Sequence, residues 1–515
     1  MQIKASLFFS TYLLLNWSFR CSYGAMILAL APVASTSHWN VIDAVLQTLV
    51  ARGHNVTVIT PFVKKYPITN YTEILIPKGK ESAISMHWNY VMNECSMGNS
   101  LPILNERHQN TCKFLFGLEE FWRTIRTIKF DLFITEWLAS SCDSYVSYHL
   151  QIPQIVIATS HVHTWYLDTF ASHLNPAYVS TFHVSFAMPM NFMQRFKNFV
   201  DYLYSHIVFR WVDRDAIDIG RKYFGPNVPD ANTLMKDTSL VFTNGHFTVD
   251  LPKPLLPNFI DIGGIHLKPA KSLSEDVKNF IDGSTNGVIY FTFGSTIKMD
   301  TAPLHLQKSF IEALAEIPYR VLWKYESSNI DHLPNNVMVR KWFSQRDILA
   351  HKKVDLFISH GGISGIYEAI DSGVPVLGIP VFFDQSRNIA NIVHWGAGLM
   401  LDHNTLTKDI LVNTINEMMQ NKKRYKENAT NLSQRFKDRP RTPKEDVVYW
   451  SEYVIKHKGA SHLKSTALNL SLLEYLLLDI ITLIVLVLLV IIYLFYFILK
   501  LVTRSMCTCF KQKRD

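Results

Sequence analysis

Residues 342–385 read WFSQRDILAHKKVDLFISHGGISGIYEAIDSGVPVLGIPVFFDQ. This stretch predicts a short buried strand over 354–359, a glycine turn at 360–362, a helix over 363–372 and a second strand over 374–379. A strand, a turn, a helix and a strand in this order are typical of a parallel α/β sheet. The turn gathers unpaired backbone N–H groups and the positive end of the helix at one point, which suits a phosphate.

Polar side chains at the junctions of this stretch could surround such a phosphate and the groups bonded to it. Glu368 lies about two helical turns beyond the glycine turn, far enough to reach a ribose. Asp384 and Gln385 follow the second strand, at the carboxyl edge of the sheet where ligands collect. Trp342 offers a ring to stack on a base, and Gln345 an amide to read its edge. A lone glycine turn is more often plain scaffold, but this ordered set over 44 residues is far more specific.

The stretch closely resembles the signature of the UDP-glycosyltransferases, a family that includes the vertebrate glucuronosyltransferases and insect glycosyltransferases. The resemblance runs from Ala25 to the C-terminal tail, with Ser344 as a departure where the family usually has Pro in W-x-P-Q. It implies the α/β fold called GT-B: two facing doubly wound, Rossmann-like domains, here with one C-terminal transmembrane helix. It also implies a UDP-sugar site made of Ser295, Trp342, Gln345, His360, Gly362, Ser364, Gly365, Glu368, Asp384 and Gln385.

The N-terminal half opens with a second strand, loop and helix. Residues 25–32 predict a buried strand, 33–37 a loop of small residues, and the helix begins at about Trp39. His38 stands where the loop meets the helix. A single histidine there is more often a capping or packing residue, but the match to the family's S-H-x-x-x segment implies that it is the catalytic base. A neutral imidazole can take the proton of an acceptor hydroxyl as the oxygen attacks the sugar.

A carboxylate behind the imidazole would hold its tautomer and stabilise the cation that forms. Vertebrate members place an Asp at the end of a strand of the form F-D-x-x-x-x-D. In this chain the matching strand is 130–136, which puts Glu136 at that position. Counting backwards from Cys142 puts Trp137 there instead, and Asp143 is the alternative carboxylate. We predict that Glu136 is the partner of the histidine.

The two ends of the chain predict membrane targeting. Residues 1–24 resemble a secretory signal, and residues 480–499 form a run of 20 uncharged residues, long enough to span a bilayer. The tail 500–515 carries a net charge of +4, so the positive-inside rule predicts a cytosolic tail and a lumenal body. The last five residues, KQKRD, resemble a K-x-K-x-x retrieval signal, although basic residues can also simply fix a helix end. Together with the family, this predicts a single-pass type I protein of the endoplasmic reticulum membrane.

Charge and cysteine usage limit the classes of partner. Of the formal charge of +8, the lumenal body keeps only about +2, which argues against nucleic-acid binding. Three of the six cysteines lie in that body, Cys95, Cys112 and Cys142, so at most one disulfide bridge is expected. A GT-A fold would need an Asp-x-Asp metal motif, and none lies in a suitable place. We therefore expect no metal and no cofactor, with the UDP-sugar as a co-substrate.

The predicted order of domains follows from the resemblance and from composition. An acceptor-binding domain spans 25–250, a linker rich in Pro and Gly spans 251–285, and a UDP-sugar-binding domain spans 286–458, with its last helices folding back on the first. A juxtamembrane segment covers 459–479. Residues 182–224 are rich in Met, Phe and Tyr, which is typical of core but in this family can form an acceptor pocket or lie against lipid.

One departure bears on the sugar. Vertebrate glucuronosyl members carry an Arg shortly before the linker, whereas this chain has Asn244, as in insect members that use UDP-glucose. We therefore expect hexose transfer, with inversion, from UDP-glucose to small lipophilic hydroxyl compounds. UDP-glucuronic acid as the donor is the alternative within the family. A lumenal protein that binds UDP-sugar or lipophiles without turnover is the alternative of another class, and a homo-oligomer is left open.

Overall fold

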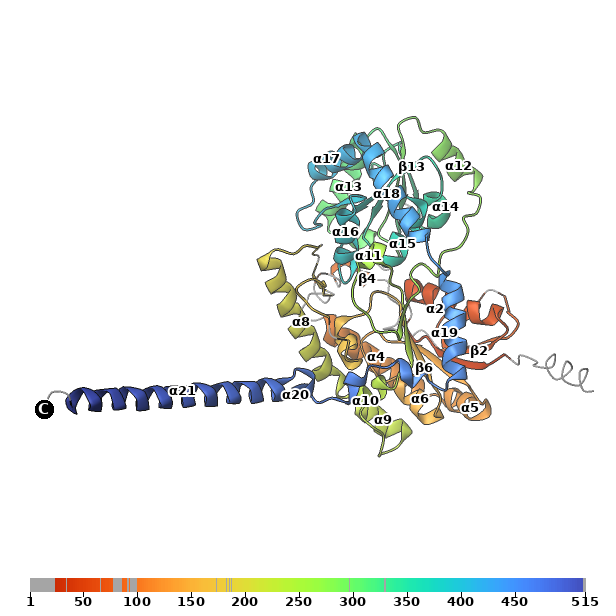
Figure 1. Cartoon of the computed structure of the whole chain (residues 1–515). Coiled ribbons are helices and arrows are strands. Elements are labelled where there is room, and N and C mark those ends of the chain that lie inside the picture. The colour runs from red at the N-terminus through yellow and green to blue at the C-terminus, as the bar shows by residue number, and fades with distance from the viewer. Residues whose placement is uncertain are drawn as a thin grey trace, which may run out of the picture. The chain divides into compact units, whose positions relative to one another are not determined.

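The computed structural model describes residues 24–512, with gaps at 34, 65, 77–85, 90–91, 93–99, 173, 182, 185, 187, 296 and 328–329. The predicted signal segment up to residue 23, Cys95 and the last three residues of the predicted retrieval signal lie outside the described residues. The chain divides into two compact units, Met1–Leu463 and Lys464–Asp515, and Figure 1 labels their elements.

Seven parallel strands form the sheet of the first domain, in the order β3-β2-β1-β5-β6-β7-β8. The strands are β1 (Met26–Leu30), β2 (Asn55–Thr60), β3 (Tyr71–Leu75), β5 (Leu132–Glu136), β6 (Gln154–Ala158), β7 (Leu240–Thr243) and β8 (Phe259–Asp261). The helices are α2 (Thr36–Ala51), α4 (Ser100–Phe116), α5 (Glu119–Thr127), α6 (Ser144–Leu150), α7 (Thr164–Thr169), α8 (Phe192–Asp213), α9 (Ala216–Phe224), α10 (Ala231–Lys236) and α11 (Phe247–Asp250). The strand order reverses between β1 and β5, and ligand crevices form beyond the carboxyl ends of strands at such a reversal.

Six parallel strands form the second sheet, in the order β12-β11-β9-β13-β14-β15. They are β9 (Val288–Thr292), β11 (Arg320–Lys324), β12 (Val337–Arg340), β13 (Val354–Ser359), β14 (Val376–Gly378) and β15 (Gly398–Met400). The helices are α12 (Glu275–Asp282), α13 (Leu304–Glu316), α14 (Gln345–Leu349), α15 (Ile363–Ser372), α16 (Gln385–His394), α17 (Lys408–Gln420) and α18 (Lys422–Lys437), and a 3-10 turn, η1, spans Met299–Thr301. Here the order reverses between β9 and β13, which places a second crevice at the ends of those strands.

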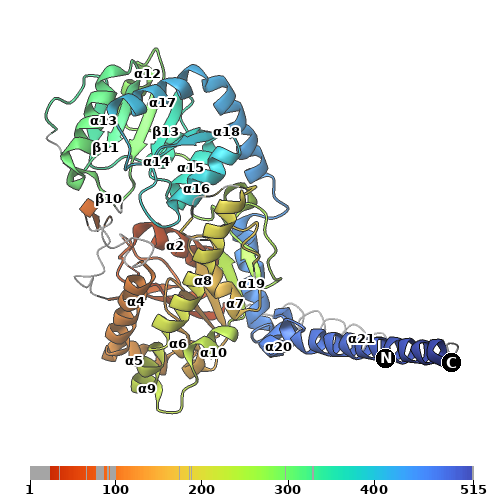
Figure 2. The same cartoon turned by 90° about the vertical axis from the view of Figure 1, so that its left-hand side faces the viewer.

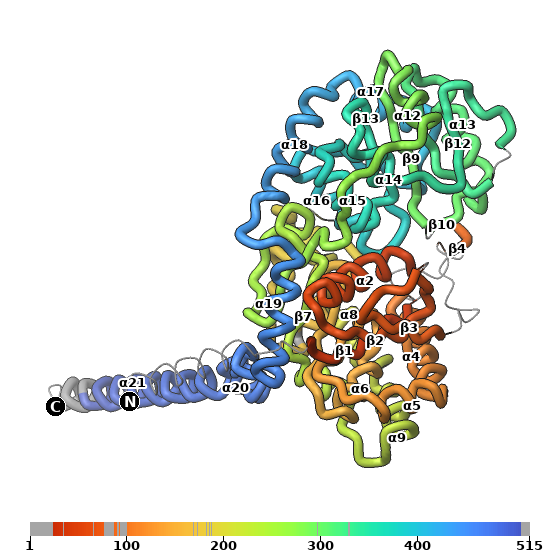
Figure 3. The backbone as a smooth tube through the Cα atoms, turned by 90° about the vertical axis from the view of Figure 1, so that its right-hand side faces the viewer, coloured from red at the N-terminus to blue at the C-terminus, as the bar shows by residue number. Residues whose placement is uncertain are grey.

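Three segments tie the two domains together. The predicted linker 251–285 contributes β8 to the first sheet and α12, through Val277 and Ile281, to the core of the second domain. After α18 the chain returns as α19 (Pro443–Lys456), which packs on α2 in the first domain (Figure 3). The short strands β4 (Met86–His87) and β10 (Ile297–Lys298) pair in parallel. The last helices thus fold back on the first domain.

The first unit ends in a 3-10 turn at Ser461–Leu463. The C-terminal unit contains a 3-10 turn at Thr466–Asn469, the short helix α20 (Leu472–Tyr475) and the long helix α21 (Leu478–Gln512). Residues 478–505 of α21 have a mean hydropathy of 3.1 over their most apolar window, and none of that window is buried. A helix of this length and composition can cross a membrane. It extends the predicted span 480–499 at both ends.

Candidate active site

His38 and Glu136 meet at the strand reversal of the first sheet. His38 lies in the first turn of α2, just after β1, and Glu136 is the last residue of the neighbouring strand β5. The distance from His38 Nδ1 to Glu136 Oε1 is 2.5 Å. The Glu136 side chain is fully buried, whereas that of His38 is 25% exposed. Thr159, just after β6, lies 3.0 Å from His38 Nδ1 and donates its hydroxyl hydrogen bond to Glu136.

This pair has the electrostatics of a supported base. Burial disfavours the charged imidazole, but the adjacent Glu136 carboxylate outweighs burial, so the pKa of His38 is raised above 6.5. Since a carboxylate only accepts, Nδ1 of His38 is the protonated nitrogen and Nε2 of the neutral ring is the acceptor. The pair can therefore take a proton on Nε2 and stabilise the resulting cation.

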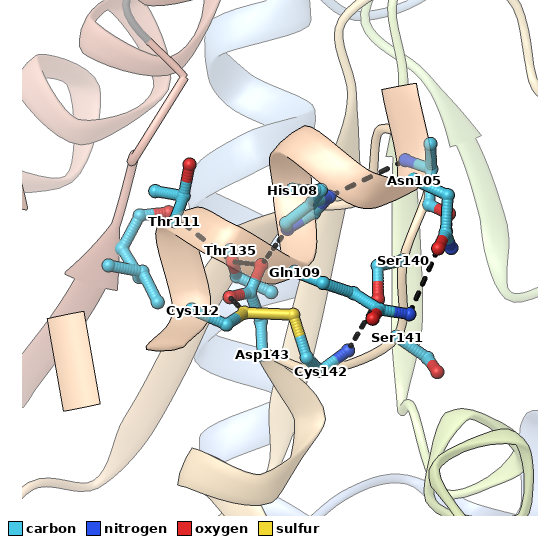
Figure 4. Close-up of a disulfide and its surroundings, with 12 residues drawn as sticks. Asn105, His108, Gln109, Thr111, Cys112, Thr135, Ser140, Ser141, Cys142 and Asp143 are labelled. Atoms are coloured by element: carbon cyan, nitrogen blue, oxygen red, sulfur yellow. Dashed lines mark hydrogen bonds and ion pairs between the residues drawn. A yellow bond between two sulfur atoms is a disulfide. The ribbon is translucent and has the colours of Figure 1, made fainter. Parts of the chain in front are cut away.

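Asp143, the alternative carboxylate, lies in a different cluster (Figure 4). One of its oxygens is 2.9 Å from His108 Nε2, and the same oxygen accepts a hydrogen bond of 3.2 Å from Thr135. It also adjoins the disulfide bridge between Cys112 and Cys142, the single bridge among the described residues. The four side chains of His108, Cys112, Cys142 and Asp143 have metal-like spacing, but both sulfurs are joined to each other.

The second reversal, between β9 and β13, brings two glycine turns against His360. A Cβ added at Gly294 would lie 2.6 Å from His360 Cε1, and one added at Gly362 would lie 2.6 Å from His360 Nε2. Gly294 also has a φ of 75°, a conformation that side chains rarely adopt. Burial, with Lys324 nearby, lowers the pKa of His360 to about 4. The ring is thus neutral at neutral pH and offers a hydrogen bond rather than a charge.

The start of α15 adjoins this histidine. The helix begins after Gly362 with no side-chain cap, so its first N–H groups are available at the turn. The hydroxyl of Ser364 is buried and has no hydrogen-bond partner among the described residues. Ser295 follows the other turn and is exposed. Together these groups form a corner lined by N–H and O–H donors, which can bind an anion.

Two of the predicted base and ribose contacts, Gln345 and Glu368, lie against or on α15. Gln345 Nε2 donates a hydrogen bond of 2.6 Å to Glu368 Oε2. Burial raises the pKa of Glu368, and the Gln345 amide opposes that rise. Gly365 leaves room for this amide, since a Cβ there would lie 3.1 Å from Gln345 Nε2. Trp342 is 66% exposed and lies near the start of α14.

Asp384 and Gln385 stand at the start of α16. Gln385 is buried, and its side-chain oxygen accepts hydrogen bonds from the backbone N–H groups of Val381 (2.9 Å) and Phe382 (3.2 Å), so this oxygen braces the preceding turn. Asp384 accepts a hydrogen bond of 2.9 Å from Asn388. Its charge also helps to raise the pKa of His38. Electrostatics therefore already couple the base to the second domain.

Sequence reasoning missed two of these groups. Thr159 gave no signal, because nothing in a Thr after a strand marks it as a contact of a catalytic pair. Asn388 lies one helical turn after Asp384, and that spacing could have been noticed.

Asn244 is the residue from which the donor sugar is predicted. It is buried, its side-chain nitrogen donates to the carbonyl of Thr159 (2.9 Å), and its side-chain oxygen accepts from the N–H of Gly264 (3.2 Å). The Asn244 amide thus links the segment at Thr159 to the segment at Gly264.

The family described as "UDP-glucoronosyl and UDP-glucosyl transferase" has a sequence model that matches residues 26–514. The chain belongs to this family. It is 42% identical over 489 residues to UDP-glucosyltransferase 2 of Dactylopius coccus, with 94% of each chain covered. It is 31% identical over 503 residues to human UDP-glucuronosyltransferase 2B7, with 92% of each covered. The crystal structure of the glycotransferase of kitacinnamycin superposes with a TM-score of 0.57 at 18% identity, over 83% of this chain and 99% of that one.

These matches confirm two predictions. The fold is GT-B, with two doubly wound domains, and the chain is a glycosyltransferase of the UDP-sugar family. Helix α21 and the membership of this family indicate a membrane-anchored protein.

Proposed function

We propose that the chain transfers glucose, with inversion, from UDP-glucose to hydroxyl groups of small lipophilic acceptors. The observation that carries this proposal is the contact of the buried Glu136 carboxylate with His38. The charge of Asp384, in the second domain, also helps to raise the pKa of this histidine. His38 Nε2 takes the acceptor's proton as its oxygen forms a bond to C1 of the sugar. The bond from C1 to the diphosphate oxygen breaks with its electrons on UDP. A single displacement of this kind inverts the anomeric carbon.

The leaving diphosphate would be held at the start of α15. The N–H groups after Gly362, the Ser364 hydroxyl and neutral His360 are the donors at that corner. Because these donors can carry the developing charge, we expect the reaction to need no metal ion. A chelator such as EDTA should leave the rate unchanged, and a loss that Mg²⁺ restores would contradict this part of the proposal.

Glucose is the proposed sugar on two grounds. The relative from Dactylopius coccus at 42% identity is named a glucosyltransferase, whereas the human relative at 31% is named a glucuronosyltransferase. A uronate carboxylate also calls for a cation, and Arg387, three residues after Asp384, is already paired with buried Asp250. UDP-glucuronic acid remains the alternative donor.

Helix α8 supports lipophilic acceptors and contact with membrane lipid. It buries polar side chains, among them Asn198, Asp201, Ser205 and Asp213, and turns its apolar side chains outward. The exposed set is Phe192, Met193, Phe196, Phe199, Val200, Leu203, Ile207 and Trp211. Figure 2 shows α8 running along the first domain. An inverted helix of this kind suits a lipid surface, from which lipophilic acceptors can be drawn.

The lipid contact is tested with the full chain in vesicles. Replacing Phe196, Phe199 and Leu203 together by Ser should raise KM for a membrane-soluble acceptor and leave KM for a water-soluble phenol unchanged. An equal change for both acceptors would contradict the contact. For localisation we propose the endoplasmic reticulum with a lumenal body. Changing Lys511 and Lys513 to Ser should move the protein onward to the cell surface, and continued residence in the endoplasmic reticulum would contradict the retrieval signal.

The function itself is tested by turnover. Microsomes that contain the chain are offered UDP-glucose or UDP-glucuronic acid with a panel of phenols and aliphatic alcohols. We expect β-glucosides from α-linked UDP-glucose. Glucuronides would overturn the proposed sugar and keep the mechanism. UDP-glucose binding without any product would favour the non-catalytic binding protein.

A further inference from the structure

A series of buried, hydrogen-bonded polar groups crosses the interface between the two GT-B domains, here called the domain seam. His161, in the loop after β6 of the first domain, has its Nε2 atom 2.5 Å from Oδ1 of Asn388 on α16 of the second. The Asn388 Nδ2 group donates to Gly361 O and to Asp384 Oδ2, both at 2.9 Å. His161 and Asn388 are both buried. These hydrogen bonds thus end on Asp384, one of the predicted contacts of the UDP-sugar.

The donors and acceptors of these hydrogen bonds can be assigned by elimination. A carbonyl and a carboxylate can only accept, so the Asn388 group that faces them is the amide nitrogen. The Asn388 oxygen therefore faces His161, and it can only accept. Nε2 of His161 must carry a proton and donate it. The hydrogen bonds run in one direction, from His161 through Asn388 to Asp384.

The other side of His161 is clamped by a second buried group. Nδ1 of His161 lies 3.1 Å from Oδ1 of Asp250 at the end of α11, and Arg387 bonds to the same oxygen. Lys253 bonds to the other oxygen of this carboxylate. Burial acts to raise the pKa of Asp250, but Arg387 leads the charges that hold it well below its usual range. Nδ1 of His161 faces Asp250 without an aligned hydrogen bond, and the two cations are the charged partners of that carboxylate. Such a buried cluster resists displacement, because removing one partner leaves a buried charge uncompensated.

The loop that carries His161 also reaches the base. Thr159, two residues earlier, contacts both His38 and Glu136. One short loop therefore touches the acceptor base at one end and, through Asn388, the donor-side carboxylate at the other. A misplacement of about 1 Å between reacting groups can lower a rate by about 10²-fold.

We propose that His161 and Asn388 are positioning residues. Across the domain seam, they hold Asp384 at a fixed position relative to His38. The network sets the affinity for the sugar half of the donor and the rate of transfer. The proposal rests on the proposed function in one respect, since it takes Asp384 to be the contact of the donor sugar. The predicted contacts of UDP all lie in the second domain, so replacing His161 in the first domain should leave UDP binding unchanged.

The test compares two replacements of His161 in the full chain. His161→Gln keeps a donor near the position of Nε2, and His161→Leu removes it at similar volume. We expect kcat for glucosyl transfer to fall about 10²-fold in His161→Leu and to recover at least tenfold of that loss in His161→Gln. Tyr367→Phe is the matched control, because it removes another hydrogen bond across the seam, 2.9 Å to the Asn244 carbonyl, without touching Asp384.

A binding readout separates this proposal from the proposed function. By calorimetry, Kd for UDP-glucose should weaken about tenfold in His161→Leu, while Kd for UDP changes less than twofold. That pattern would support the network even if the wild type transferred no glucose. The absence of transfer would contradict the proposed function alone. The network is refuted if UDP and UDP-glucose weaken equally, if His161→Gln is as impaired as His161→Leu, or if Tyr367→Phe loses as much activity.

Discussion

Replacing Glu136 by Gln keeps the shape of the side chain but removes the charge that faces His38. In the wild type this carboxylate lies 2.5 Å from the ring nitrogen and is fully buried, so it stabilises the imidazolium as the base takes its proton. The amide cannot do so, and it can present an N–H to Nδ1, which favours the wrong tautomer. We expect the variant to fold and to bind UDP-glucose, but to transfer slowly.

The size of the loss follows from the charge pair. Two unit charges about 4 Å apart at an effective dielectric constant of about 20 attract each other by about 4 kcal/mol. Since about 1.4 kcal/mol is tenfold in rate, losing this attraction in the transition state costs about 10³-fold in kcat. His38 is 25% exposed, and solvent screens part of the attraction. We therefore expect a loss of about 10² to 10³-fold.

The pH profile gives an independent check on the direction in which Glu136 shifts the pKa of His38. The base works only when neutral, and its raised pKa places the acidic fall-off of kcat/KM above the ordinary pH of 6.5. Without Glu136, burial dominates and lowers the pKa of His38, so the fall-off should move to lower pH while the plateau drops. Initial rates with an aliphatic alcohol from pH 5 to 9 measure both effects. Phenols, which lose their proton more readily, should be less affected.

Two results would refute this reasoning. A wild-type kcat in Glu136→Gln would mean that the carboxylate does not support the base. A reduced plateau with an unmoved acidic fall-off would mean that Glu136 acts on folding or substrate position rather than on the ring.

Further predictions concern the donor site and stability. Glu368→Gln should raise KM for UDP-glucose about tenfold, as the loss of one charged hydrogen bond of about 1.5 kcal/mol requires, and a lowered kcat at unchanged KM would contradict a ribose contact. Gly294→Ala should abolish UDP binding to an immobilised-nucleotide column, because the new Cβ meets His360 at 2.6 Å in a conformation with φ of 75°, and normal retention would contradict it. Replacing Cys112 and Cys142 together by Ser opens a cross-link between positions 30 residues apart and should lower the free energy of unfolding by about 3–4 kcal/mol, seen as a lower Tm that reductant no longer changes.

The sequence could predict what depends on local pattern and chain order. The strand 354–359 and the helix 363–372 were expected at the bounds that β13 and α15 have, because apolar periodicity and the glycines at both ends act locally. The pairing of His38 with Glu136 comes from the resemblance to the family's S-H-x-x-x and F-D-x-x-x-x-D segments, and it agrees with the rule that parallel strands place their carboxyl ends at one edge.

The rest depends on contacts between distant segments. His161 and Asn388 are 227 positions apart, and no periodicity relates them. The amide of Asn244 likewise bonds the Thr159 carbonyl, 85 positions away, and the Gly264 N–H, 20 positions away. Helix α8 has the composition of a core helix, and only its docking shows that the polar face is the buried one.

The most direct test of the central claim is His38→Ala beside the wild type, with UDP-glucose and an aliphatic alcohol in the same microsomes. Kd for UDP-glucose is measured on both proteins. We predict that glucoside formation falls by at least about 10²-fold while donor affinity is kept, because the base is lost and the donor site is not. Glucoside formation at the wild-type rate in His38→Ala would contradict the account.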